Sequence, residues 1–205
     1  MDVRAENIYK RYIGKYIIKD FNYHFSSGQN YGVQGPNGSG KSTLIQILSG
    51  YLSPSKGNIY YTNSGGEKID RDTIYRSIAI AAPYFELDLE LTPSEIFDHL
   101  KIFKDYRVAN TKELLEILRL EGNEHKVIKN FSSGMNQRLI LGLALLSDAE
   151  IILLDEPTSF LDADSKSLFT ELVTSYCMDK TMIIASNDPF DFKETKEIIT
   201  INNMD

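Results

Sequence analysis

The sequence has 205 residues, enough for one well-filled core or one core with a small attached subdomain, so it predicts a single domain over residues 1–205. Its 22 basic and 29 acidic residues give a net charge of −7, which argues against a nucleic acid as the main partner. The N-terminal MDVRAENIYK lacks the apolar segment of an export signal, and no apolar stretch approaches the roughly 18 residues that span a bilayer. We therefore expect a soluble chain in a reducing compartment, with the lone Cys177 in the core.

The first third of the chain is predicted to alternate strands and turns. Alternating and β-branched runs indicate strands near Val3–Ile8, Tyr16–Phe25 and Asn30–Val33, and a helix is expected from Lys41 to about Ser49. Between the last of these strands and the helix lies GPNGSGKST, Gly35–Thr43. The order is therefore strand, glycine loop, helix.

The middle of the chain changes from strands to helices. Asn58–Thr62 and Ile78–Ala81 are predicted strands, joined by a surface loop that contains TNSGGEKIDRD. From Pro93 to about Glu121, PSEIFDHLKIF and TKELLEILRL carry apolar residues at helical spacing. We expect a helical insert over about residues 91–135.

The last third returns to alternating helices and strands. Helices are predicted over Ser133–Ser147 and Asp164–Met178. Ile151–Leu154 and TMIIAS are apolar runs typical of strands buried on both faces. Strands that alternate with helices imply an α/β fold with a largely parallel sheet.

The glycine loop fits the pattern G-x-x-x-x-G-K-[ST] through Gly35, Gly40, Lys41 and Ser42. Glycines let backbone N–H groups curl around a polyanion, Lys41 adds a cation, and Ser42 offers a hydroxyl to Mg²⁺. The alternative is a structural glycine turn. The candidate ATP-binding residues of this loop are Gly35, Pro36, Asn37, Gly38, Ser39, Gly40, Lys41, Ser42 and Thr43.

A pair of carboxylates ends the buried run IILLD. Asp155 at the strand end can hold Mg²⁺ through water, and Glu156 can polarise an attacking water. Many strands end in acidic pairs without a catalytic role, so this signal gains its weight from the glycine loop. With that loop, Glu156 and Lys41 become candidate catalytic residues, and Ser42 and Asp155 become candidate metal ligands.

Two further motifs resemble one family. FSSGMNQR, Phe131–Arg138, resembles the signature motif of ATP-binding cassette (ABC) ATPases, commonly LSGGQ followed by one residue and QR. DEPTSFLD, Asp155–Asp162, is similar to that family's Walker B motif and D-loop. The resemblance covers nearly the whole chain. It implies a P-loop NTPase fold with a mainly parallel sheet core, an N-terminal antiparallel β subdomain and a helical insert.

The resemblance also implies partners and further site residues. Two such domains, most simply a homodimer, would pair head to tail and enclose ATP between one glycine loop and the signature residues Ser132, Ser133 and Gly134 of the other. Alternatively, FSSGMNQR is an N-capped helix without a special role. Tyr12 falls where the family stacks an aromatic ring on adenine. Tyr16 is a rival, either ring can simply cover the sheet, and GTP can also stack.

The sequence departs from the family at groups that support turnover. Tyr84 stands where the family has a glutamine near Mg²⁺ and the attacking water, and Asn187 replaces the switch histidine. Ser133 and Met135 replace a glycine and a glutamine of the signature. Since Lys41 is retained with the rest of the glycine loop, we expect Mg-ATP to bind and hydrolysis to be slow or dependent on a partner, with Asn187 as a weaker catalytic group.

The functional prediction is the ATP-binding subunit of an ABC transporter, cytoplasmic and held on the inner face of the membrane by separate permease subunits. PYFELDLELTPSEIF lies in the family's contact region for a permease helix and would suit an apolar helix with basic flanks; an ordinary edge strand is the alternative. Two other functions stay open: an ATP-gated dimerising switch with little hydrolysis, and a soluble ABC protein outside transport.

Overall fold

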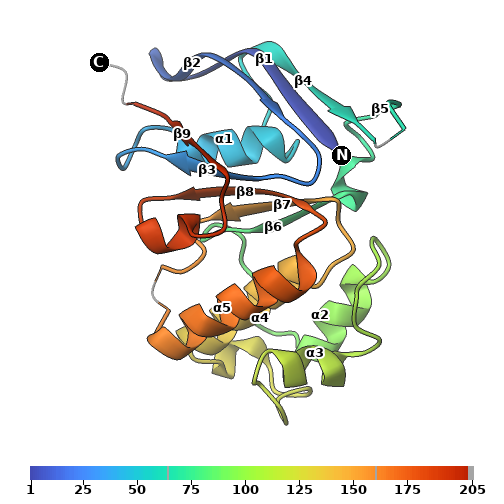
Figure 1. The fold of residues 1–205 in the computed structure, drawn as a ribbon. Coiled ribbons are helices and arrows are strands. Elements are labelled where there is room, and N and C mark those ends of the chain that lie inside the picture. Colours follow the sequence, from blue (N-terminus) through green and yellow to red (C-terminus); the bar gives the residue numbers. More distant parts are fainter. Residues whose placement is uncertain (64, 160, 203–205) are drawn as a thin grey trace.

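Figure 1 shows two sheets, one above the other, with helix α1 (Lys41–Leu48) between them and the other helices beneath the lower sheet. The structure is a computed structural model that describes residues 1–63, 65–159 and 161–202. Ser64 of the predicted surface loop and Phe160 of the predicted D-loop lie outside these residues. Within the described ranges, no helix has the length and apolar character needed to cross a bilayer.

The strands divide into an antiparallel and a parallel sheet, as predicted. The antiparallel sheet has the order β2-β1-β4-β5. Its strands are β1 (Asp2–Tyr12), β2 (Lys15–Phe25), β4 (Lys56–Thr62) and β5 (Lys68–Ile69). The parallel sheet has the order β6-β7-β8-β3-β9. Its strands are β3 (Asn30–Gln34), β6 (Ile78–Ala81), β7 (Ile151–Asp155), β8 (Thr181–Ser186) and β9 (Glu197–Thr200).

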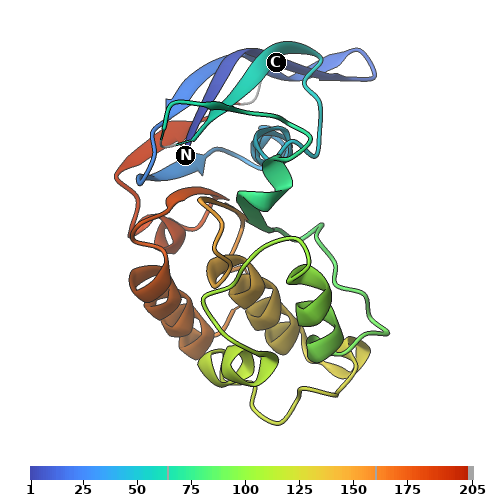
Figure 2. The same ribbon diagram turned by 90° about the vertical axis from the view of Figure 1, so that its right-hand side faces the viewer.

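The helices of the lower layer begin at side-chain caps. They are α2 (Pro93–Leu100), α3 (Thr111–Ile117), α4 (Ser133–Leu145) and α5 (Ala163–Tyr176). Their N-terminal backbone N–H groups donate to the side chains of Thr92, Asn110, Ser132 and Asp162, respectively. The predicted insert thus contains α2 and α3 and ends where α4 begins. Figure 2 shows this layer from the side, separated from the antiparallel sheet by the parallel one.

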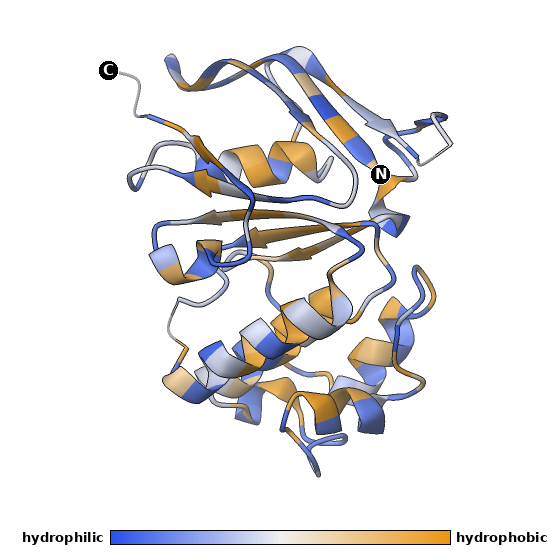
Figure 3. Cartoon of the chain, in the orientation of Figure 1, coloured by the Kyte–Doolittle hydropathy of each residue, from blue (hydrophilic) through white to orange (hydrophobic). Residues whose placement is uncertain are grey.

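The parallel sheet separates two apolar cores. On β7, Ile151 and Leu153 face the core shared with α1 and the antiparallel sheet, whereas Ile152 and Leu154 face the core shared with the lower helices. This alternation follows from the two-residue period of a strand, and it explains why IILLD is apolar at every position before the aspartate. In Figure 3 the central strands are accordingly coloured as hydrophobic along their length. Cys177 is buried in the helical core, as predicted.

Candidate functional site

Three polar segments meet at one edge of the parallel sheet. Parallel pairing aligns Gln34 of β3 with Ser186 of β8, and Asp155 of β7 with Ala185 of β8. The segments that follow these strands are the glycine loop, Glu156 and Asn187. Since the carboxyl ends of parallel strands share one edge, residues more than 100 positions apart in the sequence become neighbours.

The glycine loop needs glycine at positions that pack against backbone. Gly40 has a φ of 98°, and a Cβ there would lie 3.0 Å from the carbonyl oxygen of Ile17 on β2. A Cβ on Gly35 would lie 2.1 Å from the carbonyl oxygen of Ile201. The loop is therefore clamped between the antiparallel sheet and the segment after β9, and it leads directly into α1.

Lys41, the first residue of α1, points back into the loop and is only 6% exposed. Its Nζ donates to the Gly35 carbonyl at 2.7 Å and to Oδ1 of Asn187 at 3.1 Å, and lies 3.8 Å from Oε1 of Glu156. The amide of Asn187 in turn donates to Oδ1 of Asn37 at 2.6 Å. The structure thus brings two of the predicted residues, Glu156 and Asn187, to the ammonium group of a third, Lys41.

Asp155 lies at the bottom of this site with an unsatisfied oxygen. It is 1% exposed, and among the described residues its Oδ1 has no hydrogen-bond partner. Burial raises the pKa of its carboxyl, the Glu156 charge raises it further, and the Ser42 hydroxyl and Lys41 lower it. A buried carboxylate oxygen without a partner is costly unless a cation or water reaches it.

Glu156 follows β7 in a left-handed backbone conformation, with a φ of 48°. A non-glycine residue rarely adopts this conformation, and its N–H is fixed by donation to the Ala185 carbonyl at 2.7 Å. Its Oε2 accepts hydrogen bonds from the hydroxyls of Ser186 at 3.1 Å and Ser159 at 3.4 Å. The turn brings the carboxylate over the glycine loop beside Lys41.

The signature residues lie elsewhere. Ser132, Ser133 and Gly134 begin α4 in the helical layer, and the Ser132 hydroxyl accepts a hydrogen bond from the Met135 N–H. Within the described residues, no hydrogen bond or ion pair links them to Lys41 or Glu156. Ser132 therefore caps a helix, and within one chain it is not part of the phosphate-loop site.

Tyr12 and Tyr16 lie on the hairpin of β1 and β2. Tyr12 is 44% exposed, with the Lys10 ammonium 5.1 Å from its ring. The centroid of the Tyr16 ring instead lies 5.8 Å from that of the Tyr9 ring, in a T-shaped arrangement, and 5.8 Å from the carbon of the Arg11 guanidinium. Because Tyr16 is already packed between neighbours, Tyr12 is the more accessible ring.

Tyr84, at the position of the missing glutamine, lies in the loop after β6. Partial burial and the Asp155 carboxylate raise the pKa of its phenol, so the hydroxyl belongs to the electrostatic environment of the site. Residues 83–92 contain no strand. The edge-strand alternative for PYFELDLELTPSEIF is therefore wrong: besides turn and helix-cap contacts, the carbonyls of Leu89 and Leu91 accept hydrogen bonds from the backbone N–H groups of Lys129 and Ile128, but these contacts do not form a strand ladder.

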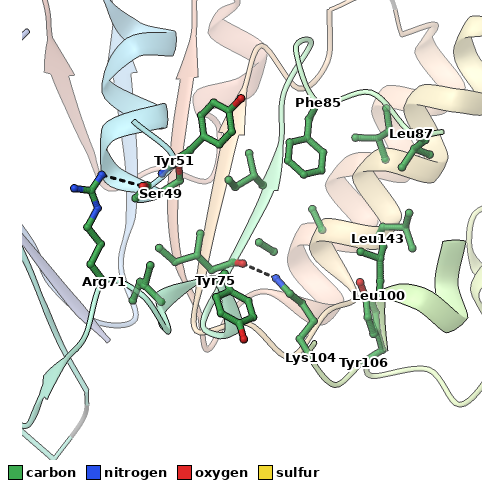
Figure 4. Close-up of a pocket in the computed structure, with 17 residues that line it drawn as sticks. Ser49, Tyr51, Arg71, Tyr75, Phe85, Leu87, Leu100, Lys104, Tyr106 and Leu143 are labelled. Carbon is green, nitrogen blue, oxygen red and sulfur yellow. Dashed lines mark hydrogen bonds between the residues drawn. The ribbon is translucent and has the colours of Figure 1, made fainter. Parts of the chain in front are cut away.

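A groove of about 350 Å³ lies between this loop, β6 and the helical layer. Its lining is largely aromatic and aliphatic and includes Tyr51, Tyr75, Phe85, Leu87, Leu100 and Tyr106. Two cations also line it, and Figure 4 shows Arg71 and Lys104 reaching in from different sides. Arg71 donates to the Gly50 carbonyl and Lys104 to the Ile78 carbonyl. None of the ion pairs among the described residues includes either cation.

Some residues of the site were not predicted from the sequence. Ser186 and Asp191 lie beneath Glu156 and are almost fully buried. The position of Ser186 at the end of a strand next to the glycine-loop strand was a usable signal. Asp191 gave none, because an aspartate in DPFDF is typical of an exposed turn.

The comparisons with known proteins agree with this geometry. A family model described as "ABC transporter" matches residues 18–159. The chain is 34% identical to the Nod factor export ATP-binding protein I of Rhizobium johnstonii, over 87% of this chain and 58% of that protein. It is 32% identical to the linearmycin resistance ATP-binding protein LnrL of Bacillus subtilis, over 83% and 56%. The chain thus spans less than two thirds of the length of these relatives.

A solved structure with the same fold is a dimeric, post-hydrolysis state of an ATP-binding cassette bound to ADP and Pi. Its TM-score is 0.84 at 26% sequence identity, and the match covers 99% of this chain and 97% of that one. The antiparallel sheet, the parallel sheet and the helical layer all lie within this match. From the family model and from a site with a clamped glycine loop, Lys41, Asp155 and Glu156 in the family's order, we conclude that the chain belongs to the ABC transporter family.

Proposed function

We propose that this chain is the ATP-binding subunit of a membrane transporter, which binds Mg-ATP, pairs head to tail with a second cassette and hydrolyses ATP slowly. The observation that supports this most strongly is the meeting of Lys41, Asp155 and Glu156 at one sheet edge. A polyanion cradle, a carboxylate for a metal and a carboxylate for water are the groups that nucleotide hydrolysis requires. Because the chain spans less than two thirds of the length of its curated relatives, transport itself is proposed.

The triphosphate would lie in the glycine loop. Backbone N–H groups within residues 37–43 and the Lys41 ammonium would bind it, with Tyr12 stacked on the base. Lys41 now donates to loop carbonyls and Asn187, so a phosphate oxygen would take over part of these contacts. GTP is an acceptable alternative because stacking on Tyr12 discriminates poorly between bases.

Ser42 and Asp155 would hold Mg²⁺ on its protein side. The buried, unpartnered Oδ1 of Asp155 fits this assignment, since an ion or its water would satisfy it. The described residues contain no cluster of three or more His, Cys, Asp or Glu side chains suited to a metal. Mg²⁺ keeps several waters and takes phosphate oxygens as ligands, so one or two protein oxygens suffice to hold it. Bound there, the ion would neutralise phosphate charge.

Glu156 would act as the general base towards the attacking water. Its carboxylate lies 3.8 Å from Lys41 and next to the backbone N–H of Asn187. Asn187 would donate a neutral hydrogen bond to the γ-phosphate, without the charge that a histidine can carry. A hydrogen bond to a charged group contributes about 1.5–3 kcal/mol, so weakening such contacts at Asn187 and Tyr84 is the basis for slow turnover.

A second cassette, most simply another copy of this chain, would complete the site. Ser132, Ser133 and Gly134 are exposed or half-buried at the start of α4 and lie outside their own chain's phosphate site. A helix N-terminus offers unpaired N–H groups and a favourable dipole to an anion. The similar cassette bound to ADP and Pi is dimeric.

The apolar groove would receive a segment of the membrane partner. Phe85 and Leu87 of the predicted contact segment line it, whereas Leu89 is exposed outside it. Its two charged side chains are Arg71 and Lys104, and among the described residues their hydrogen bonds go to the backbone carbonyls of Gly50 and Ile78. A partner helix with an apolar face and a central carboxylate would therefore fit better than the basic flanks that the acidic residues of the segment suggested. Such docking would place the chain on the cytoplasmic face of a membrane.

The alternative is a dimerising switch that binds ATP and rarely hydrolyses it. The neutral groups at Asn187 and Tyr84 favour this alternative, since both stand where the family has groups for turnover. A soluble ABC protein outside transport would lack a membrane partner for the groove. These functions differ in hydrolysis and in partner, so they can be separated.

The test uses purified chain with Mg-ATP. The transporter function predicts measurable phosphate release that Glu156→Gln lowers by roughly 10²-fold or more, while the variant accumulates as an ATP-dependent dimer in gel filtration. Release unchanged in Glu156→Gln would reject Glu156 as the base. A wild-type chain that dimerises with ATP but releases no phosphate above background would instead support the switch.

A further inference from the structure

Beneath Glu156 lies a buried hydroxyl and carboxyl pair. Ser186, the last residue of β8, is fully buried, and Asp191 in the 3₁₀ turn Pro189–Phe192 is 2% exposed. Oδ2 of Asp191 lies 2.6 Å from the Ser186 hydroxyl oxygen, which is also 3.1 Å from Oε2 of Glu156. The backbone N–H of Asp188 donates to the same Ser186 oxygen at 3.0 Å. One hydroxyl therefore joins two carboxyl groups.

The hydrogens available at Ser186 restrict how these bonds are made. A serine hydroxyl has one hydrogen to donate and two lone pairs. One lone pair accepts the Asp188 N–H. If Asp191 were ionised, the single hydrogen would go to the nearer oxygen of Asp191, and Glu156 would receive none. If Asp191 is neutral, its own hydrogen occupies the second lone pair, and the Ser186 hydrogen is left for Glu156.

The surroundings of Asp191 favour the neutral form. Burial raises the pKa of its carboxyl, and the charges of Asp188 and Glu156 raise it further, whereas the neighbouring Ser186 and Thr158 hydroxyls lower it. No ion pair in the described part of the chain includes Asp191, because the neighbouring Lys166 pairs with Asp188 at 2.7 Å. An ionised carboxylate buried without a cation is strongly disfavoured.

We propose that Asp191 is a positioning residue for Glu156: its carboxyl hydrogen bonds to Ser186, and Ser186 then donates to Oε2 of Glu156. This contact complements the turn at Glu156, where the backbone is already held in a left-handed conformation. With Oε2 held from below by Ser186, Oε1 is the oxygen that faces Lys41 and the glycine loop. The proposal rests on the proposed role of Glu156 as general base.

Four variants test this in a phosphate-release assay with Mg-ATP. Ser186→Ala removes the bridge, and Asp191→Leu removes, at similar volume, the hydrogen bond that orients the Ser186 hydroxyl; both should lower kcat roughly tenfold with KM changed less than about twofold. Asp191→Asn keeps a donor towards Ser186, so it should retain kcat within about threefold of wild type. Ser147→Ala is the matched control, because Ser147 is equally buried and, among the described residues, its hydroxyl bonds only the Ala144 carbonyl near the end of α4.

The pattern separates positioning from a loss of stability. A structural role alone would lower the melting temperature in all of these variants and leave kcat per folded molecule unchanged. Equal kcat in Ser186→Ala and wild type would overturn the proposal. So would an Asp191→Asn variant as slow as Asp191→Leu, since it would show that the carboxyl does not act as a donor.

A second measurement does not depend on hydrolysis. In crystal structures of the nucleotide-free variants, the 3.1 Å contact between Ser186 and Oε2 of Glu156 should persist in Asp191→Asn, whose amide can still donate to Ser186, and the Glu156 carboxylate should shift in Ser186→Ala. Loss of the contact in Asp191→Asn, or an unshifted carboxylate in Ser186→Ala, would overturn the proposal. If the wild-type chain released no phosphate, or Glu156→Gln hydrolysed normally, the proposed function would fail, and these structures would still decide the positioning of Glu156.

Discussion

The buried Lys41 and the half-buried Lys104 represent two different kinds of site in this protein. Lys41 lies in a polar site with Glu156 at 3.8 Å and the amide oxygen of Asn187 at 3.1 Å. Lys104 lines an apolar groove, and its ammonium donates a hydrogen bond to the Ile78 carbonyl. Burial lowers the pKa of Lys104 to about 8, and no neighbouring acid offsets this effect. The charge of Lys41 is partly balanced by Glu156, whereas no ion pair among the described residues balances the charge of Lys104.

The difference indicates what each site needs from outside. Near Lys41 the chain supplies carboxylates as well as a cation, which suits a ligand that brings negative phosphates together with a metal. Near Lys104 the chain supplies apolar surface and two cations, which suits a partner that brings an apolar face and a carboxylate. The following experiments change one lysine environment at a time.

The largest expected effect is at Lys41. Mg-ATP should raise the melting temperature of the wild-type chain, because a ligand that binds the native state stabilises it by mass action. Lys41→Ala should remove most of this shift, since it deletes the cation at the centre of the phosphate site. Thermal melts with and without Mg-ATP give the result, with Lys104→Met as the control variant. An equal shift in Lys41→Ala would place the nucleotide elsewhere.

The next effect concerns Lys104 and the membrane partner. If a partner carboxylate pairs with this amine, Lys104→Met should weaken association roughly 30-fold or more, because the carboxylate would be left buried and unpaired. The measurement is co-purification with an integral membrane protein encoded beside this chain. Phe85→Asp, which places a charge in the apolar lining, should abolish recovery. Undiminished recovery of both variants would exclude the groove as the docking site.

A smaller effect is expected at the turnover groups near Lys41. Asn187→His, alone or with Tyr84→Gln, should raise kcat about tenfold with little change in KM, if these positions limit the chemistry. Steady-state phosphate release is the measurement, and the Mg-ATP melting shift checks that binding is unaffected. A double variant no faster than wild type would mean that another step limits turnover, such as dimer closure at the signature, where Ser133 and Met135 depart from the family pattern.

The last effect is on stability. With a pKa of about 8 when folded and an ordinary value near 10.5 when unfolded, Lys104 binds more protons in the unfolded chain between these pH values. The free energy of unfolding should therefore gain a contribution that rises from about pH 8 to 10.5. Denaturant melts of wild type and Lys104→Met at pH 6.5 to 10 isolate it, because other titrating groups cancel in the difference. A flat difference would mean that Lys104 is solvated in the folded chain.

The sequence by itself determined the phosphate side of the molecule. GPNGSGKST is one continuous segment, and its glycines, Lys41 and Ser42 are set by local backbone requirements that a pattern can state. The apolar run before Asp155 likewise identified a strand buried on both faces. The alternation of strands and helices was enough to predict the parallel sheet and the helical insert. These features depend on local chemistry and short-range periodicity, so they could be predicted without knowledge of any long-range contact.

Only the tertiary structure decided which distant residues meet. The strand order placed Asn187 against Lys41, and Ser186 and Asp191 beneath Glu156, although nothing in DPFDF indicates a buried carboxyl. The groove joins Arg71, Phe85 and Lys104 from separate segments, and its two cations favour a partner carboxylate, whereas the acidic residues around Phe85 favour basic flanks. Burial and pairing depend on what packs from elsewhere in the chain. A single sequence gives the identity of each charged group, but only the packed fold decides whether that group faces water or its partner.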